Sequence, residues 1–236
     1  MGFDSSSEYG PKLKKYDLAI ELDSFEISSF ITLGQYKAYL VNIKKDSSFN
    51  FYIKQLPDSS ILSPRDYAKY ITEKRFEKFP VVGITWEAAM NFCKWKTLQE
   101  SNDHLEFVYR LPKISEWLCA YEFLKSDKKY NFNQQYSDWS LSRYFEGYGG
   151  FYNEFVYDFV IIPQRNDNPR DKRVYVLGNS YLFQHEKLYQ HLGHGYYTFD
   201  GHREVGFRLV KHYLTNEKKT SNSSWILKYW GVPQSN

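Results

Sequence analysis

Residues 109–117 read Tyr-Arg-Leu-Pro-Lys-Ile-Ser-Glu-Trp, and no other stretch of the chain says as much about its fold. The apolar run over 107–111 predicts a short extended segment, which Pro112 closes because proline lacks a backbone N–H. Large apolar side chains then recur at helical spacing, which predicts a helix over about 115–125. The stretch therefore indicates a strand, a turn and a helix in succession.

Two further phrases lie on either side of this stretch. Residues 80–86 read Pro-Val-Val-Gly-Ile-Thr-Trp and lead into a helical pattern that runs to about Leu98. Thr85 can cap that helix, because a threonine hydroxyl accepts a hydrogen bond from a free amide of the first turn. Residues 206–210 read Gly-Phe-Arg-Leu-Val, and a final strand is expected over 205–211.

The other elements are short. Imperfect alternation predicts a half-buried strand over 17–27, and Thr32 is expected to cap a helix that begins with Leu33, Tyr36 and Leu40 on one face. Turn residues over 46–64 indicate a loop that contains a short strand near 49–53.

Further strands are expected over 155–162 and 173–177, around a charged loop at 164–172. The segments 130–150 and 183–203 show no periodicity, and irregular stretches of this length usually serve function. This order of elements predicts one α+β domain over 1–214 that is rich in irregular structure.

The composition excludes several classes of function. The chain has 236 residues and a net charge of +3, and its basic residues are scattered, so we expect no nucleic-acid binding. No stretch approaches 18 continuous apolar residues, so we expect no direct membrane insertion. The 22 Tyr, 18 Phe and 6 Trp residues suit both a core and an adhesive surface, and we expect a protein partner.

The two cysteines, Cys93 and Cys119, both lie in helical patterns. The simplest interpretation is that both are small buried apolar residues without a structural disulfide between them.

In their order and spacing, the three phrases resemble the formylglycine-generating enzyme family, also called the sulfatase-modifying-factor family. The resemblance extends to Ile31-Thr32 with Gln35-Tyr36, to Cys93 with Trp95, and over nearly the whole chain up to Lys211. It implies a variant of the C-type lectin fold. It also implies that Arg110 and Arg208 are mostly architectural.

Departures from the family pattern bear on function. Lys113 replaces the threonine that would cap the following helix and pair with Glu116, so Ser115 is an alternative cap. Glu154-Phe-Val-Tyr-Asp-Phe159 matches the calcium-binding motif of some members, but Phe155 replaces an asparagine, which degrades a calcium site. The copper-binding cysteine pair of the oxidising members is missing, since there is no cysteine from Ser180 to Gly206. We therefore expect a non-catalytic member, a pseudoenzyme with no catalytic residues and no cofactor.

An alternative is a metal-dependent oxidase or oxygenase that uses the four histidines of 185–202. Imidazole and carboxylate groups bind iron and copper, and a site would draw on His191, His194, His202 and Asp158. The competing interpretation is that these are polar loop histidines with no shared geometry. Glu116, Asp158 and Glu204 could pair for acid–base work, but a structural salt bridge of these residues to Arg110 or Arg208 is the expectation we favour.

A binding surface is the main functional prediction. Rigid amphipathic rings among small polar residues are typical of adaptable binding loops. The two aperiodic segments supply such rings at Tyr136, Trp139, Tyr144, Tyr148, Tyr189, Tyr196 and Tyr197.

The C-terminal part is expected to form a polar spacer over 215–224 and an apolar peptide over 225–236. This peptide is a candidate partner-docking tail, although it could also dock on its own domain. Its apolar residues are Trp225, Ile226, Leu227, Tyr229 and Trp230. Relatives without the cysteine pair include bacterial gliding-motility and secretion-associated lipoproteins, so a cell-envelope location is expected for a mature lipoprotein domain and a cytoplasmic one otherwise.

Overall fold

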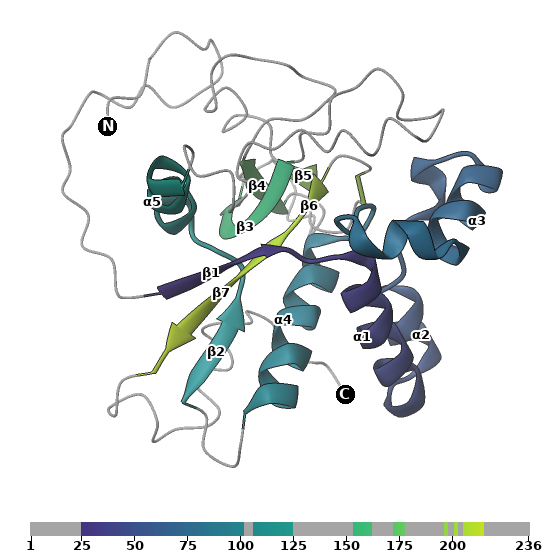
Figure 1. The fold of residues 1–236 in the computed structure, drawn as a ribbon, viewed down its shortest axis with the longest axis horizontal. Helices are drawn as coiled ribbons and strands as arrows, with labels where there is room; N and C mark the ends of the chain where they lie inside the picture. Colours follow the sequence, from purple (N-terminus) through teal and green to yellow (C-terminus); the bar gives the residue numbers. More distant parts are fainter. Residues whose placement is uncertain are drawn as a thin grey trace, which may run out of the picture.

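The computed structural model describes residues 25–101, 106–124, 153–161, 172–177, 196–197, 201–202 and 205–214. Helices dominate the first half of this part of the chain and strands the second half (Figure 1). The helices and helical turns are α1 (Leu33–Asp46), α2 (Phe49–Ile53), η1 (Ser59–Ile61), α3 (Pro64–Thr72), η2 (Lys74–Lys78), α4 (Trp86–Glu100) and α5 (Ile114–Leu124). The strands are β1 (Phe25–Phe30), β2 (Phe107–Arg110), β3 (Asn153–Ile161), β4 (Lys172–Leu177), β5 (Tyr196–Tyr197), β6 (Val205–Gly206) and β7 (Arg208–Tyr213).

The first sheet has three antiparallel strands in the order β1-β7-β2, so the last strand of the described chain lies in the middle. His212 of β7 pairs with Phe25 of β1 on one side and with Val108 of β2 on the other. Helix α4 packs against β2, and α1 contacts both α2 and α4. In Figure 1, α1, α2 and α3 lie at the right of this sheet and α5 lies at the left.

The second sheet has the order β5-β4-β3-β6, with β6 parallel to β3 and the other pairs antiparallel. Only Phe207 separates β6 from β7, so the chain passes directly from the second sheet into the first. The strand predicted over 205–211 is thus present, but it is divided at Phe207 and extends to Tyr213. The sequence phrase around Phe207 is the junction between the two sheets.

Helices α1 and α4 confirm two predictions. The Thr32 hydroxyl accepts a hydrogen bond from the Gln35 N–H at 3.2 Å, and the Gln35 side chain accepts one from the Thr32 N–H at 2.9 Å. These two bonds form a complete capping box. Thr85 caps α4 by accepting from the Ala88 N–H at 3.0 Å.

The short strand predicted near 49–53 is wrong, because these residues form helix α2. Aromatic and β-branched residues favour strands, but Ser48 caps a helix here by accepting from the Phe51 N–H at 3.3 Å. Helix α3 was not predicted at all. Its start is nevertheless visible in the sequence, since Ser63 is its N-cap and Pro64 its first residue.

The remaining predicted elements agree with the structure in type and differ at their ends. β2 and α5 lie where the opening phrase places them, and α5 begins at Ile114, so Ser115 is inside the helix and is not its cap. Strands β3 and β4 are confirmed. β1 overlaps the predicted first strand at 25–27 and continues to Phe30, while 17–24 lie outside the described residues.

An aromatic cluster joins α1, α4 and the junction between the sheets. Tyr36, Phe92 and Phe207 are almost fully buried, with ring centroids 5.7 Å apart for Tyr36 and Phe92 and 5.4 Å for Phe92 and Phe207. The Tyr36 hydroxyl donates to the carbonyl oxygen of Gln55 at 2.8 Å, and the Tyr39 hydroxyl donates to its side-chain oxygen at 3.1 Å. The buried tyrosine hydroxyls therefore have partners in the chain that follows α2.

The two cysteines differ in environment. Cys93 is buried on α4, as expected, and burial raises the pKa of its thiol. Cys119 is exposed on α5, so the prediction that it is buried is wrong. Both thiols are free.

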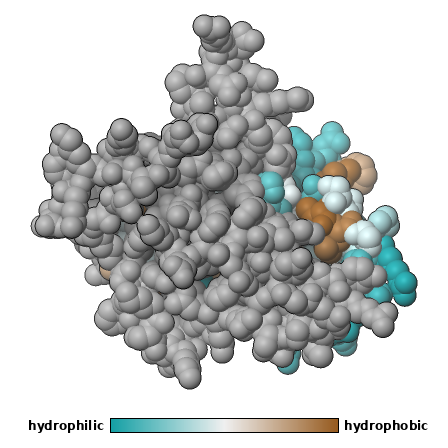
Figure 2. Space-filling view, turned by 90° about the horizontal axis from the view of Figure 1, so that it is seen from above, coloured by the Kyte–Doolittle hydropathy of each residue, from teal (hydrophilic) through white to brown (hydrophobic). Residues whose placement is uncertain are grey.

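Among the described residues, no helix has both the length and the apolar character needed to cross a membrane. Figure 2 shows that described apolar side chains form a small area among polar ones on one side of the molecule.

Candidate binding surface

The segment that precedes β6 is held against the Pro80–Trp86 phrase. The Gly83 N–H donates to the His202 carbonyl oxygen at 2.9 Å, and the Gly83 carbonyl oxygen accepts from the Asp58 N–H at 2.6 Å. The Val205 N–H also donates to the His202 carbonyl oxygen, at 3.3 Å. The C-terminal end of the predicted binding segment 183–203 is thus fixed by backbone bonds.

Two glycines make this close approach possible. A Cβ atom on Gly201 would lie 2.2 Å from the Gly83 carbonyl oxygen, which is a backbone atom that cannot turn away. Gly83 has a φ of 77°, a conformation that favours glycine, and a Cβ there would lie 2.3 Å from Cδ1 of Ile61. We call this arrangement the Gly83–Gly201 contact.

Asp58 lies beside both glycines, since a Cβ on Gly201 would lie 3.0 Å from the Asp58 Cβ. Its carboxylate oxygen Oδ1 accepts from the Ser60 N–H at 2.8 Å and so caps η1. The Asp58 side chain therefore serves the local backbone, and the arrangement as a whole can position a loop end.

Two of the predicted surface residues, Tyr196 and Tyr197, form β5. Their backbones pair with Val174 and Arg173 of β4, so they lie at the edge of the second sheet and not in an irregular segment. The segment is thus attached at two places, by β5 and by the Gly83–Gly201 contact. The other predicted surface and tail positions lie outside the described residues: Tyr136, Trp139, Tyr144, Tyr148, Tyr189, Trp225, Ile226, Leu227, Tyr229 and Trp230.

The candidate metal ligands are only partly described. His202 lies beside the Gly83–Gly201 contact, and Asp158 is in β3, where pairing with β4 is irregular between Phe155 and Phe159. His191 and His194 lie outside the described residues. Within the part of the chain that the structure describes, no three His, Cys, Asp or Glu residues form a group that could hold a metal ion.

Arg110 and Glu116 form a buried ion pair, which confirms the salt bridge favoured for Glu116. Nη1 and Nη2 of Arg110 donate to the two carboxylate oxygens at 2.6 and 2.5 Å, and the Lys113 N–H donates to Oε2 at 2.8 Å. Burial acts to raise the pKa of Glu116, but the hydrogen bonds and charge of Arg110 outweigh it and hold the pKa below its ordinary value. Glu116 thus keeps half of the capping box although Lys113 has no hydroxyl.

Arg208 is also buried, and two of its contacts are with residues of β1. Its guanidinium lies 4.2 Å from the centre of the Phe30 ring, and Nη1 donates to the Ser28 carbonyl oxygen at 3.2 Å. The described contacts of Arg110 and Arg208 hold strands and helices together.

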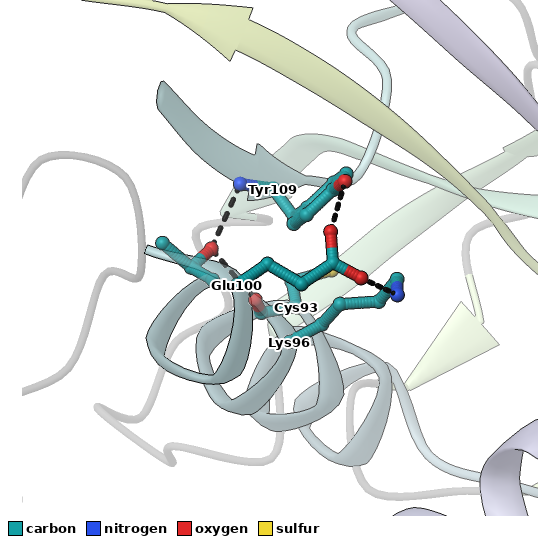
Figure 3. A network of polar contacts seen from close by, with 5 residues as sticks. Cys93, Lys96, Glu100 and Tyr109 are labelled. Carbon is teal, nitrogen blue, oxygen red and sulfur yellow. Dashed lines mark hydrogen bonds and ion pairs between the residues drawn. The ribbon is translucent and has the colours of Figure 1, made fainter. Parts of the chain in front are cut away.

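A polar network between α4 and β2 was not predicted from the sequence (Figure 3). The Thr97 hydroxyl accepts from the Tyr109 N–H at 2.8 Å and donates to the Cys93 carbonyl oxygen at 2.9 Å. The Tyr109 hydroxyl donates to Glu100 at 2.6 Å, and Lys96 bonds to the same carboxylate. The outer edge of β2 is therefore partly closed by a helix.

The charges in this network shift two pKa values. Burial tends to raise the pKa of Glu100, but hydrogen bonds from Lys96 and Tyr109 lower it below its ordinary value. Burial, together with the carboxylate of Glu100, raises the pKa of Tyr109. Tyr109 is therefore a neutral donor at physiological pH, with a structural role.

A family model for the sulfatase-modifying factor enzyme 1-like domain matches residues 16–158, which is more than half of the chain. The chain belongs to this family. The matched part of this sulfatase-modifying-factor domain includes the opening phrase and ends in β3, before the segment without cysteines.

A solved structure supports the same fold. The structure titled "Crystal Structure of CarF" aligns with a TM-score of 0.54 over 84% of this chain and 89% of that chain, at 16% identity. At this identity the similarity shows the fold alone, and it confirms the predicted α+β class. No curated protein gives a significant match to this sulfatase-modifying-factor domain.

Proposed function

We propose that this sulfatase-modifying-factor domain is a non-catalytic binding or scaffold module. The observation that carries the proposal is the absence of any cysteine from Ser180 to Gly206, where oxidising members have their copper-binding pair. A thiolate is both the metal ligand and the redox group in that chemistry. Without it, formylglycine generation has no reactive group in this segment.

The two cysteines elsewhere are poor substitutes. Cys93 is buried in α4, and its raised pKa keeps the thiol protonated. Cys119 is exposed on α5. Both precede β3, whereas the family's pair would follow β4.

The Tyr-rich segments are the proposed recognition surface for a protein or another macromolecule. Support comes from their composition and from the two attachments of segment 183–203 to the described framework. A loop that is already fixed at its base loses less conformational entropy when it binds a partner. The partner class we propose is a component of a bacterial gliding-motility or secretion assembly, as in relatives that also lack the cysteine pair.

Affinity capture with the full chain tests this role. We expect a partner that is retained by wild-type protein and lost with Tyr144→Ser/Tyr148→Ser or with Tyr196→Ser/Tyr197→Ser. Tyr213→Ser is the matched control, because Tyr213 is an exposed tyrosine on the first sheet. Equal recovery with all variants would reject the loops as the recognition surface, and a Trp225→Ser/Trp230→Ser variant tests the tail in the same way.

The competing hypothesis is an iron- or copper-dependent oxidase or oxygenase that uses the histidines of 185–202. Elemental analysis of the purified full chain discriminates between the two. Stoichiometric iron or copper that is lost in His191→Ala or His194→Ala would favour the enzyme. A metal content that is unchanged by both substitutions would reject this site.

A further inference from the structure

Helix α2 carries an unusual amount of exposed apolar surface. Phe49 is 74% exposed and Ile53 is 46% exposed, and the two side chains lie one helical turn apart on the same face. Val41, on the neighbouring helix α1, is 63% exposed. We call these three residues the α1–α2 apolar patch.

The patch lies on a rigid support. Helix α2 packs against α1, and its Tyr52 is partly buried against the core, while Phe49 and Ile53 are exposed. Ser48 caps its start, and the chain after it is tied down by Gln55, whose side chain binds Tyr39 and Asn91. The orientation of Phe49 and Ile53 is therefore set before any partner arrives.

The charge around the patch is positive. Lys44, Lys45 and Lys54 are all exposed, and Asp46 is the acidic residue between Val41 and Lys54, which gives this stretch a net charge of +2. Lys44 and Lys45 also lie in the last turn of α1, where their positive charges interact favourably with the negative end of the helix dipole. Lys54 follows α2, so lysines precede and follow Phe49 and Ile53 in the sequence.

We propose that the α1–α2 apolar patch docks the protein peripherally on an anionic lipid surface. Bulky exposed apolar side chains with exposed lysines near them in the sequence fit the interfacial region of a bilayer, where apolar groups enter the headgroup boundary and ammonium groups contact anionic lipids. Peripheral contact of this kind needs no spanning helix.

Vesicle flotation with the full chain tests this proposal. We expect binding to vesicles of phosphatidylcholine with phosphatidylserine, little binding to phosphatidylcholine alone, and loss of binding at high salt. Phe49→Ser/Ile53→Ser is expected to weaken binding by about tenfold or more. Lys44→Gln and Lys54→Gln are each expected to weaken it by about fivefold.

Matched variants make the result specific. Leu98→Ser replaces an apolar residue of α4 that is 55% exposed, and Lys113→Gln replaces an exposed lysine before α5. Both should bind like the wild type. Circular dichroism and urea unfolding verify that every variant is folded.

Three outcomes would overturn the proposal. One is no enrichment on anionic vesicles at low salt. Another is a loss with Leu98→Ser as large as that with Phe49→Ser/Ile53→Ser. The third is self-association in sedimentation that depends on Phe49 and Ile53 without vesicle binding, which would assign the patch to a protein contact.

Discussion

Glu116 accepts from two kinds of donor, the guanidinium of Arg110 and the backbone N–H of Lys113. The charged side chains of Arg110 and Glu116 are both almost fully buried. Such a group resembles a catalytic carboxylate in isolation, but its bonds to Arg110 join β2 to α5 and its bond to the Lys113 N–H caps the start of α5. At the scale of single residues, the described hydrogen bonds of Glu116 therefore serve the stability of the fold.

Replacing Glu116 with glutamine should lower the free energy of unfolding by about 3–5 kcal/mol, because Arg110 then remains buried without an opposite charge. Urea unfolding measures this. The control is Glu100→Gln, because the Glu100 side chain is 42% exposed and its ion pair with Lys96 lies at the surface, which predicts a loss below about 1 kcal/mol. Equal losses in the two variants would contradict a special role for the buried pair.

The pair also predicts a pH dependence. The folded-state pKa of Glu116 lies below its unfolded value of about 4.3. Ionised Glu116 therefore stabilises the fold above about pH 4.3, and this contribution is lost as pH falls through the folded-state pKa. The difference in unfolding free energy between wild type and Glu116→Gln should shrink below about pH 4, and a constant difference would contradict this.

The Gly83–Gly201 contact allows a second test at this scale. Gly201→Ala should destabilise the protein by about 2 kcal/mol or more, since its Cβ meets a backbone oxygen. Gly83→Ala should also destabilise it, but adding Ile61→Val removes the clashing Cδ1 and should recover part of the loss. Thermal unfolding of the three variants distinguishes steric conflict from backbone strain.

At the scale of elements, single side chains form hydrogen bonds to the free backbone amides at one helix start and one strand edge. α5 has only half of a capping box, because the backbone N–H of Lys113 bonds to Glu116 and no hydroxyl returns a bond. At the edge of β2, the Tyr109 N–H donates a hydrogen bond to the Thr97 hydroxyl of α4. Both features can be changed by one substitution without touching the aromatic cluster.

Lys113→Thr should complete the capping box and stabilise the protein by about 0.5–2 kcal/mol. The measurement is the shift of the unfolding midpoint in urea. Lys113→Ala serves as the control, because it removes the lysine without adding a hydroxyl. A stabilisation that is equal in both variants would show that loss of the charge, and not the cap, is responsible.

Thr97→Val should cost about 1–3 kcal/mol, because the Tyr109 N–H at the edge of β2 loses its acceptor. Thr97→Ser keeps the hydroxyl and should cost less. Hydrogen exchange of the Tyr109 amide should accelerate in Thr97→Val by more than the change in global stability explains. Unchanged exchange would mean that another group shields this edge.

At the scale of the whole molecule, Phe207 joins the two sheets. Its ring packs on Phe92, and its carbonyl oxygen accepts from the Ile31 N–H at 3.0 Å. Phe207→Ala should therefore cost about 3–5 kcal/mol. In the wild type, tryptophan fluorescence and far-ultraviolet circular dichroism should report one shared unfolding transition. Two separate transitions there would contradict coupling of the two sheets.

Local signals allowed much of the framework to be predicted. Thr32 with Gln35 and Thr85 mark helix starts, and Pro112 marks the turn before α5. α2 could not be predicted in the same way, because its aromatic composition favours a strand and tertiary contacts through Gln55 decide the outcome. Ser63-Pro64 was a readable start signal for α3.

The candidate site was less predictable, because it depends on contacts between distant segments. The approach of Gly201 to Gly83 leaves no periodic pattern in the sequence. Tyr196 and Tyr197 were expected in an irregular segment, and this was wrong because strand pairing with β4 is a long-range contact that leaves no local signal.

The central position of β7 has a consequence for how this protein is made. Phe25 pairs with His212, so the first described strand gains its partner only when nearly all of the chain has been synthesised. At roughly 5–20 residues per second, β1 and the apolar face of α1 wait about 10–40 seconds on the ribosome for β7, and α4 waits about 5–20 seconds. During that interval we expect chaperones to bind these exposed apolar segments. A premature stop before residue 205 would release a chain without β7, the central strand of the first sheet.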